Sequence, residues 1–67
     1  PTGNTNLSQR ELQALKLAAG GLNQNQIAEE MQIKAVTAKK HLINAYAKLG
    51  ASNKVSAIQI AKIKKLF

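Results

Sequence analysis

The lysines are the most numerous residues of this chain that could do chemistry, and they are unevenly distributed. Eight of the ten basic residues, all of them lysines, lie between Met31 and Phe67, and no acidic residue follows Glu30. Residues 1–30 carry a formal charge of −1 (two basic and three acidic side chains) and residues 31–67 carry +8, which together give the net charge of +7. A face with this charge is expected to attract a polyanion: DNA, RNA or an anionic lipid surface.

Catalytic and metal-binding chemistry lack the side chains that they need. The chain has no cysteine, one histidine and three acidic residues, all glutamates. His41 has no companion nucleophile or second ligand, so we expect it to pack or to bond the backbone rather than to act as a catalytic base. We therefore predict no catalytic residue, no metal, no cofactor and no small-molecule ligand, and an enzyme is the weakest hypothesis.

Length and composition favour one small helical domain. The 67 residues are 45% hydrophobic but only 3% aromatic, and the apolar residues are mostly Leu, Ile, Val and Ala. This mixture favours helices over strands, so we predict a compact all-α domain of four helices. It should occupy residues 7–67, after a linker or cloning remnant at residues 1–6, and should be a piece of a longer protein.

No segment is predicted to enter or cross a membrane. No apolar run approaches the roughly 20 residues that a spanning helix needs. The N-terminus also lacks the basic and hydrophobic regions of a signal peptide. We therefore expect a cytoplasmic location.

Two capping boxes predict the first two helices. In the first, Ser8 caps the helix and Glu11 follows three residues later, and Gly20 ends the helix after Ala19. The expected buried face of this helix consists of Leu12, Leu15 and Ala19. The same device recurs at Asn23 and Gln26, which begin a short helix ending near Gln32, and a tight turn at Ile33 follows.

Apolar spacing predicts the third and fourth helices. The third runs from Ala35 to Leu49, and its buried stripe is expected to be Ala38, Leu42, Ala45 and Leu49. The residues projecting from roughly the opposite side are Val36, Lys39, Lys40, Ile43 and Ala47. The fourth helix is expected from Asn53 to Leu66 and is apolar over more than one stripe, with Phe67 continuing the pattern, so one stripe has the character of a partner contact.

A short helix, a tight turn and a longer helix with outward lysines form the layout of a helix-turn-helix, whose second helix lies in the major groove of DNA. The residues of this segment resemble the LuxR/FixJ-type DNA-binding domain of bacterial transcription regulators. That family has the approximate pattern L-T-x-R-E-x-x-V-L-x-L-x-A-x-G, then I-A-x-x-L-x-I-S-x-x-T-V-K-x-H-L, then K-L and N-R. The matching residues are Leu7, Arg10, Glu11, Leu15, Leu17, Ala19, Gly21, Leu22, Ile27, Ala28, Ile33, Thr37, Lys39, His41, Leu42, Lys48, Leu49 and Asn53.

The resemblance implies a C-terminal output domain that binds double-stranded DNA in a sequence-specific manner. In this family the third helix reads DNA and the fourth forms a homodimer. By resemblance, the residues expected to contact bases are Val36, Lys39, Lys40 and Ile43. The residues expected to contact the DNA backbone are Lys34, Thr37, His41, Lys48 and Lys54. The residues expected at the dimer interface are Val55, Gln59, Ile60 and Ile63.

Three departures from the family pattern carry physical consequences. Lys34 replaces the Ser or Thr that caps the third helix, which forfeits about 1 kcal/mol and places a cation at the positive pole. A DNA phosphate would supply the missing negative charge. Ala38 and Ala45 stand where larger aliphatic residues are usual, so the core is either looser or filled by Tyr46. Lys54 replaces an arginine and loses its bidentate geometry.

Several alternatives stay open at this point. The lysines could form an ordinary solvated face, and Glu11 could serve only as a capping-box member or could form a structural ion pair. The outer stripe of the fourth helix could pack on the first helix instead of a second copy. The C-terminal IAKIKKLF resembles a basic amphipathic segment, so a membrane-surface helix is the leading rival. Non-specific nucleic-acid binding is weaker, because the aromatic stacking platform of single-strand readers is missing.

Overall fold

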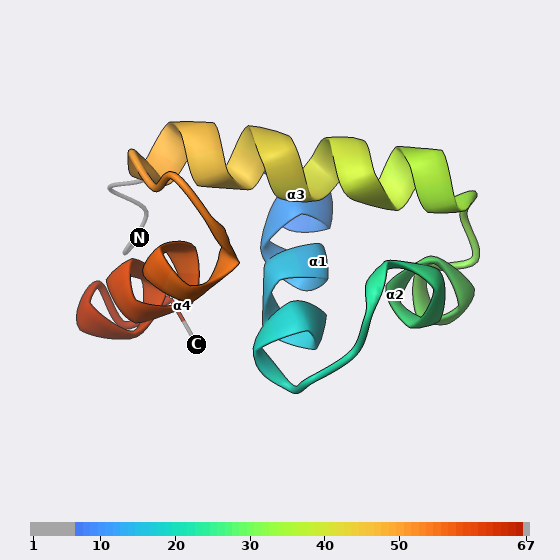
Figure 1. Ribbon diagram of the computed structural model, residues 1–67, viewed down its shortest axis with the longest axis horizontal. Coiled ribbons are helices and arrows are strands. Elements are labelled where there is room, and N and C mark those ends of the chain that lie inside the picture. The colour runs from blue at the N-terminus through green and yellow to red at the C-terminus, as the bar shows by residue number, and fades with distance from the viewer. Residues whose placement is uncertain (1–6, 67) are drawn as a thin grey trace.

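The four helices occur in the expected order, and the described residues contain no strand. The computed structural model describes residues 7–66, so the expected linker and Phe67 lie outside the described part. The helices are α1 (Gln9–Ala19), α2 (Gln24–Met31), α3 (Ala35–Leu49) and α4 (Lys54–Ile63). The longest helix, α3, lies across the other three, so its far side forms one surface of the domain (Figure 1). The all-α prediction is confirmed.

Local capping explains where three of the four helices begin. Ser8 caps α1, and its side chain and that of Glu11 form both bonds of the expected capping box. Asn23 and Gln26 form the second box at the start of α2, with both distances at 2.9 Å. Asn53 caps α4 by accepting a bond from the Ser56 amide at 2.9 Å. The exception is α3, where Lys34 occupies the cap position without a side-chain bond.

The turn between α2 and α3 is closed by backbone hydrogen bonds. Gln32 adopts the left-handed conformation with a φ of 57°, which is uncommon for a residue other than glycine. The Ile33 amide bonds the Ala28 carbonyl at 2.9 Å and the Gln32 amide bonds the Glu29 carbonyl at 3.1 Å. Because this turn ends α2 and places Ile33 against the core, α3 can leave at a steep angle to α2. The pair forms the expected helix-turn-helix.

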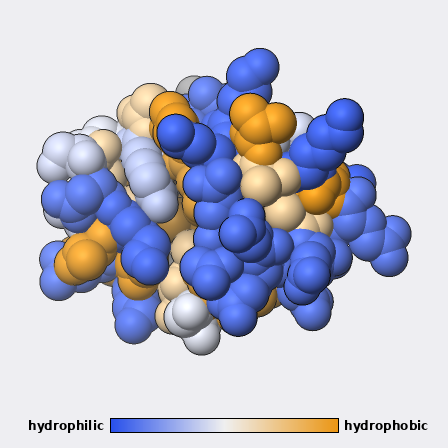
Figure 2. Space-filling model, turned by 45° about the vertical axis from the view of Figure 1, so that its right-hand side comes forward, coloured by the Kyte–Doolittle hydropathy of each residue, from blue (hydrophilic) through white to orange (hydrophobic). Residues whose placement is uncertain are grey.

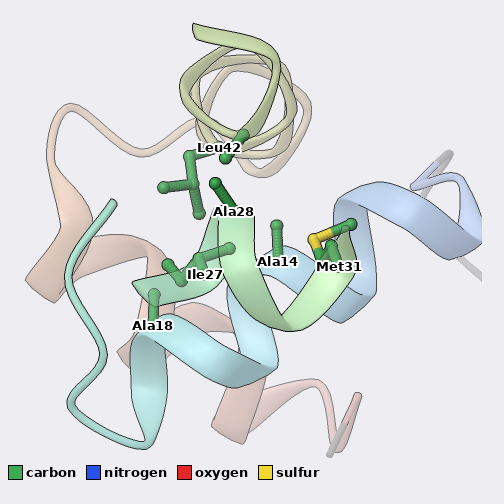
Figure 3. Close-up of a cluster of buried hydrophobic side chains, with 7 residues drawn as sticks. Ala14, Ala18, Ile27, Ala28, Met31 and Leu42 are labelled. Carbon is green, nitrogen blue, oxygen red and sulfur yellow. The ribbon is translucent and has the colours of Figure 1, made fainter. Parts of the chain in front are cut away.

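The first core cluster joins the helix-turn-helix to α1. Figure 3 shows Leu42 of α3 pointing toward Ile27 and Ala28 of α2, with α1 alongside. Its buried members are Ala14, Ala18, Ile27, Ala28, Met31, Ala38 and Leu42. Four of these seven are alanines, so the helices meet through small side chains and can approach closely. The position of α3 is therefore set by its packing on α1 and α2.

A second core cluster attaches α4. Its buried members are Leu15, Leu49, Ala57 and Ala61. Tyr46 packs against both clusters, which is the role expected for it beside the small Ala38 and Ala45, and burial raises the pKa of its hydroxyl above 10.0. Ala38 and Ala45 are both 0% exposed. The expected stripe of α3 is thus buried throughout.

The structure corrects two expectations about the other helices. On α1 the buried residues are Glu11, Ala14, Leu15 and Ala18, whereas Leu12 and Ala19, expected in the core, are only half-buried. The helix is apolar around much of its surface, so spacing alone did not select the face that neighbours cover. The last helix ends at Ile63 rather than Leu66, because Lys65 takes a φ of 58° and Leu66 turns back onto the second cluster.

Candidate nucleic-acid interface

The outward side of α3 is the first part of the candidate interface. Since Ala38, Leu42, Ala45 and Leu49 face the core, the opposite side of the same helix must face away from it. Val36 is 64% exposed and Ile43 is 50% exposed, which is unusual for large aliphatic side chains. On the surface, hydrophobic groups lie as separate patches among hydrophilic side chains (Figure 2). Exposed apolar groups set between lysines are suited to a partner that is both charged and partly apolar.

Lys39 and Lys40 are both exposed but point in different directions. At about 100° per residue, Lys40 lies about 200° around the helix from buried Ala38, whereas Lys39 lies about 100° from it. Lys40 therefore projects almost directly away from the core, close to Val36 and Ile43. Lys39 leaves from the flank on which Tyr46 lies. The four residues expected to contact bases thus share one exposed side of α3, with Lys39 at its edge.

The opposite flank of α3 carries polar side chains at helical spacing. Thr37 and His41 are half-buried there, one turn apart, and Asn44 follows as an exposed residue. Asn44 was not among the expected site residues. Its signal in the sequence is its position one turn after Lys40, where an amide would lie beside the outward lysine. Together these three residues could donate to or accept from groups along one edge of a bound polyanion.

The start of α3 is open to an anion. Lys34 is exposed at the cap position and makes no side-chain bond to the first turn. The first backbone amides of a helix lack intrahelical acceptors, and the positive end of the helix dipole lies there. A cation at this place is unfavourable for the isolated helix, but a phosphate placed here would meet both the ammonium group and the amides.

Lys48, one of the residues expected on the DNA backbone, forms an ion pair with a buried carboxylate. Its Nζ lies 2.8 Å from Oε1 of Glu11, and the Ser8 amide donates to the same oxygen at 3.0 Å. The Glu11 side chain is 8% exposed and that of Lys48 is 37% exposed. Glu11 therefore serves both as the capping-box member and as a structural ion-pair partner. The ion pair fixes the end of α3 to the start of α1, across 37 positions of sequence.

The ion pair also decides the charge state of Glu11. Burial alone would raise the pKa of this carboxyl group. The hydrogen bond from Lys48, the bond from the Ser8 amide and the charge of Lys48 outweigh that effect, so the pKa lies below its ordinary value of 4.5. Glu11 is consequently ionised at neutral pH although it is the one charged residue in the described core.

The remaining lysines and the outer side of α4 lie away from this surface or at its edge. Lys54 is exposed in the first turn of α4, and the exposed Lys62, Lys64 and Lys65 lie at the other end of that helix. Among the residues expected at a dimer interface, Val55 is 62% and Ile63 is 79% exposed, and Gln59 is exposed as well. Ile60 differs, because it is half-buried and packs on the second core cluster.

Residues 7–66 contain no cluster of three metal-ligating side chains and enclose no pocket. In the same range, no helix is long and apolar enough to cross a membrane. The candidate site is therefore a convex surface made by a helix, which suits binding in a groove of a partner rather than enclosing a small substrate.

Comparison with known proteins agrees with this description. A family model described as bacterial regulatory proteins of the luxR family, GerE, matches residues 5–61. The crystal structure of the response regulator ChrA, from a heme-sensing two-component system, matches with a TM-score of 0.86 and 38% identity. That match covers 91% of this chain and 30% of the response regulator, so the chain spans less than a third of the regulator's length.

The helix-turn-helix domains of this family are DNA-binding regulators rather than enzymes. The matched residues include all of α1, α2 and α3. The chain therefore belongs to the luxR family of bacterial regulatory proteins and is a DNA-binding domain of that family.

Proposed function

We propose that this domain binds double-stranded DNA in a sequence-specific manner, with α3 in the major groove. The observation that carries the proposal is the outward side of α3, where exposed aliphatic groups lie between exposed lysines, opposite the side that packs on the other helices. The major groove is about 12 Å wide and admits one α-helix. A helix of 15 residues is about 22 Å long, which is enough to follow several base pairs.

The proposed base contacts divide according to side-chain chemistry. Lys39 and Lys40 can donate to guanine O6 and N7, which accept in the major groove. Val36 and Ile43 can contact thymine methyl groups, and their exposure in the free domain means that binding would remove apolar surface from water. These four residues together would select the sequence.

The proposed backbone contacts fix the register of α3 without reading the sequence. Lys34 would bind a phosphate at the uncapped helix start, and Thr37 and His41 would bond phosphates along the flank. Lys54 would reach the backbone from the start of α4. Lys48 is a weaker candidate than the sequence suggested, because its ammonium group is already bonded to Glu11.

A homodimer through α4 completes the proposal. Val55, Gln59 and Ile63 form an exposed side of this helix, and Ile60 lies at its inner edge. A second copy would cover the aliphatic groups and would place two α3 helices on half-sites roughly 34–36 Å apart. We further propose that the domain is the C-terminal output module of a longer cytoplasmic regulator, supported by the partial match to a response regulator.

The rival hypothesis of a membrane-surface helix loses its main support. It required the C-terminal segment to form one continuous amphipathic helix. Instead α4 ends at Ile63, and Leu66 packs on the second core cluster. A vesicle of anionic lipid is nevertheless a useful competitor, because it presents phosphate without a groove.

Selection of bound sites from random duplex DNA, followed by footprinting, tests the proposal. The expected result is an enriched half-site, repeated about one helical turn apart if the domain dimerises. Affinity for that site should fall steeply as salt rises, because bound lysines release counterions from phosphates. Failure to enrich any sequence, together with equal binding to anionic vesicles, would contradict the proposal.

A further inference from the structure

The side chain of Gln24 joins the two helices of the helix-turn-helix at their starts. Gln24 is the first residue of α2, and its Nε2 donates to the backbone carbonyl of Ala35, the first residue of α3, at 3.0 Å. The two residues are 11 positions apart, and the bond is exposed. This contact lies at the start of α3, where no side chain caps the helix.

The acceptor of this bond belongs to the same turn that carries a candidate base contact. In an α-helix the carbonyl of residue 35 also accepts the amide of the residue four positions later, which is Lys39. A carbonyl oxygen has two lone pairs, so both donors can be accommodated. Gln24 is thereby linked through a single oxygen to the backbone of Lys39.

The other contacts between α2 and α3 do not determine direction to the same degree. Ile27, Ala28 and Met31 meet Ala38 and Leu42 in the first core cluster. Apolar burial depends on area and has little directional preference. The half-buried Ala35 also packs on this cluster, and the buried Ala38 lies in the same first turn, so apolar contacts hold this turn against α2 without giving it a strongly preferred direction. A hydrogen bond at this turn supplies a fixed direction.

We infer that Gln24 is a positioning residue for base recognition, which orients the first turn of α3 and with it the directions of Val36 and Lys39. The inference rests on the proposed function. Gln24 acts through the Ala35 carbonyl, so it contributes to selectivity among DNA sequences without touching a base. Base recognition by Val36 and Lys39 should depend on this bond more than base recognition by Ile43, which lies two turns further along α3.

The substitution Gln24→Met tests the inference, because methionine keeps the length of the side chain and its neutral charge but has no donor. Affinity is measured for the operator selected by the wild-type domain and for a shuffled duplex of equal length. We expect a loss of roughly 3- to 10-fold on the operator, as for one hydrogen bond, and none on the shuffled duplex. Gln13→Met, at an exposed position of α1, is the matched control and should change neither value.

Repeating the site selection with Gln24→Met locates the effect. Preference should weaken at the base pairs assigned to Val36 and Lys39 and persist at the base pair assigned to Ile43. Gln24→Asn retains the amide but is one methylene shorter, so it should behave like Gln24→Met. The ¹³C shift of the Ala35 carbonyl should change in both variants, with the thermal midpoint nearly unchanged.

Three outcomes would overturn the inference. Equal losses on the operator and the shuffled duplex would mean that Gln24 binds a phosphate directly. If the wild-type domain selects an operator and both variants keep the same selectivity, the bond is a surface contact without a role in recognition. The proposed function would then remain intact. A wild-type domain that selects no sequence would overturn the proposed function, and this inference with it.

Discussion

A lysine lies at each end of α3, and the two lysines have opposite environments. At its start, Lys34 is exposed beside the positive end of the helix dipole and no side chain caps the turn. At its end, Lys48 lies in the last turn, near the negative end, and pairs with the buried carboxylate of Glu11. The first arrangement costs stability in the free domain, whereas the second contributes to it. Lysines that look equivalent in the sequence thus differ in the structure: the one at the start is exposed without a capping bond, and the one at the end forms an ion pair that supports the fold.

This contrast separates the residues of α3 that are exposed from those that attach the helix to the rest of the domain. The outward side of α3 is exposed and no side chain caps its start, which leaves both available to a ligand. The end of α3 is tied to α1 by the ion pair and to α4 by Leu49. A helix anchored at one end and open at the other can present its first turns to DNA while the domain remains intact.

The largest effect is expected on the open side, from Lys39→Ala and Lys40→Ala. Each should weaken operator binding by about 1–3 kcal/mol per lost base contact and leave the thermal midpoint almost unchanged. Titrations on the selected operator and calorimetric melting of the free variants measure the two quantities. Lys64→Ala, at the exposed end of α4, serves as the control. Operator affinity unaltered in both variants would remove α3 from the interface.

The anchored end is tested by Lys48→Met. This change leaves the Glu11 carboxylate buried with the Ser8 amide but without its cation, and we expect a loss of roughly 2 kcal/mol in the free energy of unfolding. The salt dependence of DNA binding should stay the same, since Lys48 is engaged within the protein. Urea denaturation and gel-shift titrations give both values. Lys16→Met, an exposed lysine of α1, should change stability by less than about 0.5 kcal/mol.

A shallower salt dependence in Lys48→Met, with stability unaltered, would instead assign this lysine to the DNA backbone. That outcome would erase the contrast between the two ends of α3.

The charge of the same pair predicts a pH dependence. Because the pKa of Glu11 is lower in the folded than in the unfolded chain, the unfolded chain binds the proton more tightly. The stabilisation is complete above the unfolded value of about 4.5 and is lost as the pH falls through the folded value. Glu11→Gln should cost about 1 kcal/mol at pH 7, because a neutral acceptor replaces a charged one.

Denaturation of wild type and Glu11→Gln from pH 7 down to pH 3 measures the difference directly. The gap between the two proteins should narrow as the pH falls below 4.5. A gap that stayed constant over this range would show that the ionised carboxylate does not stabilise the fold.

The smallest expected change is a gain of stability at the open end. Lys34→Ser supplies the missing cap and removes the cation, so the free energy of unfolding should rise by roughly 0.5–1 kcal/mol. The same variant should bind DNA more weakly, and the slope of log affinity against log salt should decrease by about 1. Thermal melting and gel-shift titration test the two statements together. A serine variant that gained stability with unaltered DNA binding would show that Lys34 meets no phosphate.

The sequence predicted most of the fold because its signals are local. The capping boxes at Ser8 and Asn23 fixed two helix starts, and Gly20 marked the end of α1. The buried stripe of α3 was also predicted correctly, since its apolar residues recur at a single helical spacing. Each of these features depends on residues within about one or two turns of one another.

The errors occurred where packing between distant segments decides. Six of the eleven residues of α1 are apolar and they cover more than half of its circumference, so only contacts with three other helices select Ala14 and Ala18 over Leu12 and Ala19. The end of α4 was placed too late because Lys65 takes a positive φ and Leu66 packs on the second cluster instead of continuing the helix. Glu11 and Lys48 are 37 positions apart in the chain. The sequence left a structural ion pair of Glu11 open as an alternative, but it could not identify the partner.

By itself the sequence determined four helices, a helix-turn-helix and an acid-free lysine-rich half, because capping, helical periodicity and composition act over short stretches of chain. Only the tertiary structure decided which lysine forms an ion pair with a buried carboxylate. The reason is that the environment of a charge depends on what lies within a few ångströms of it. For Lys48 that neighbour is a buried carboxylate of α1, whereas Lys34, Lys39 and Lys40 are exposed on the open part of α3.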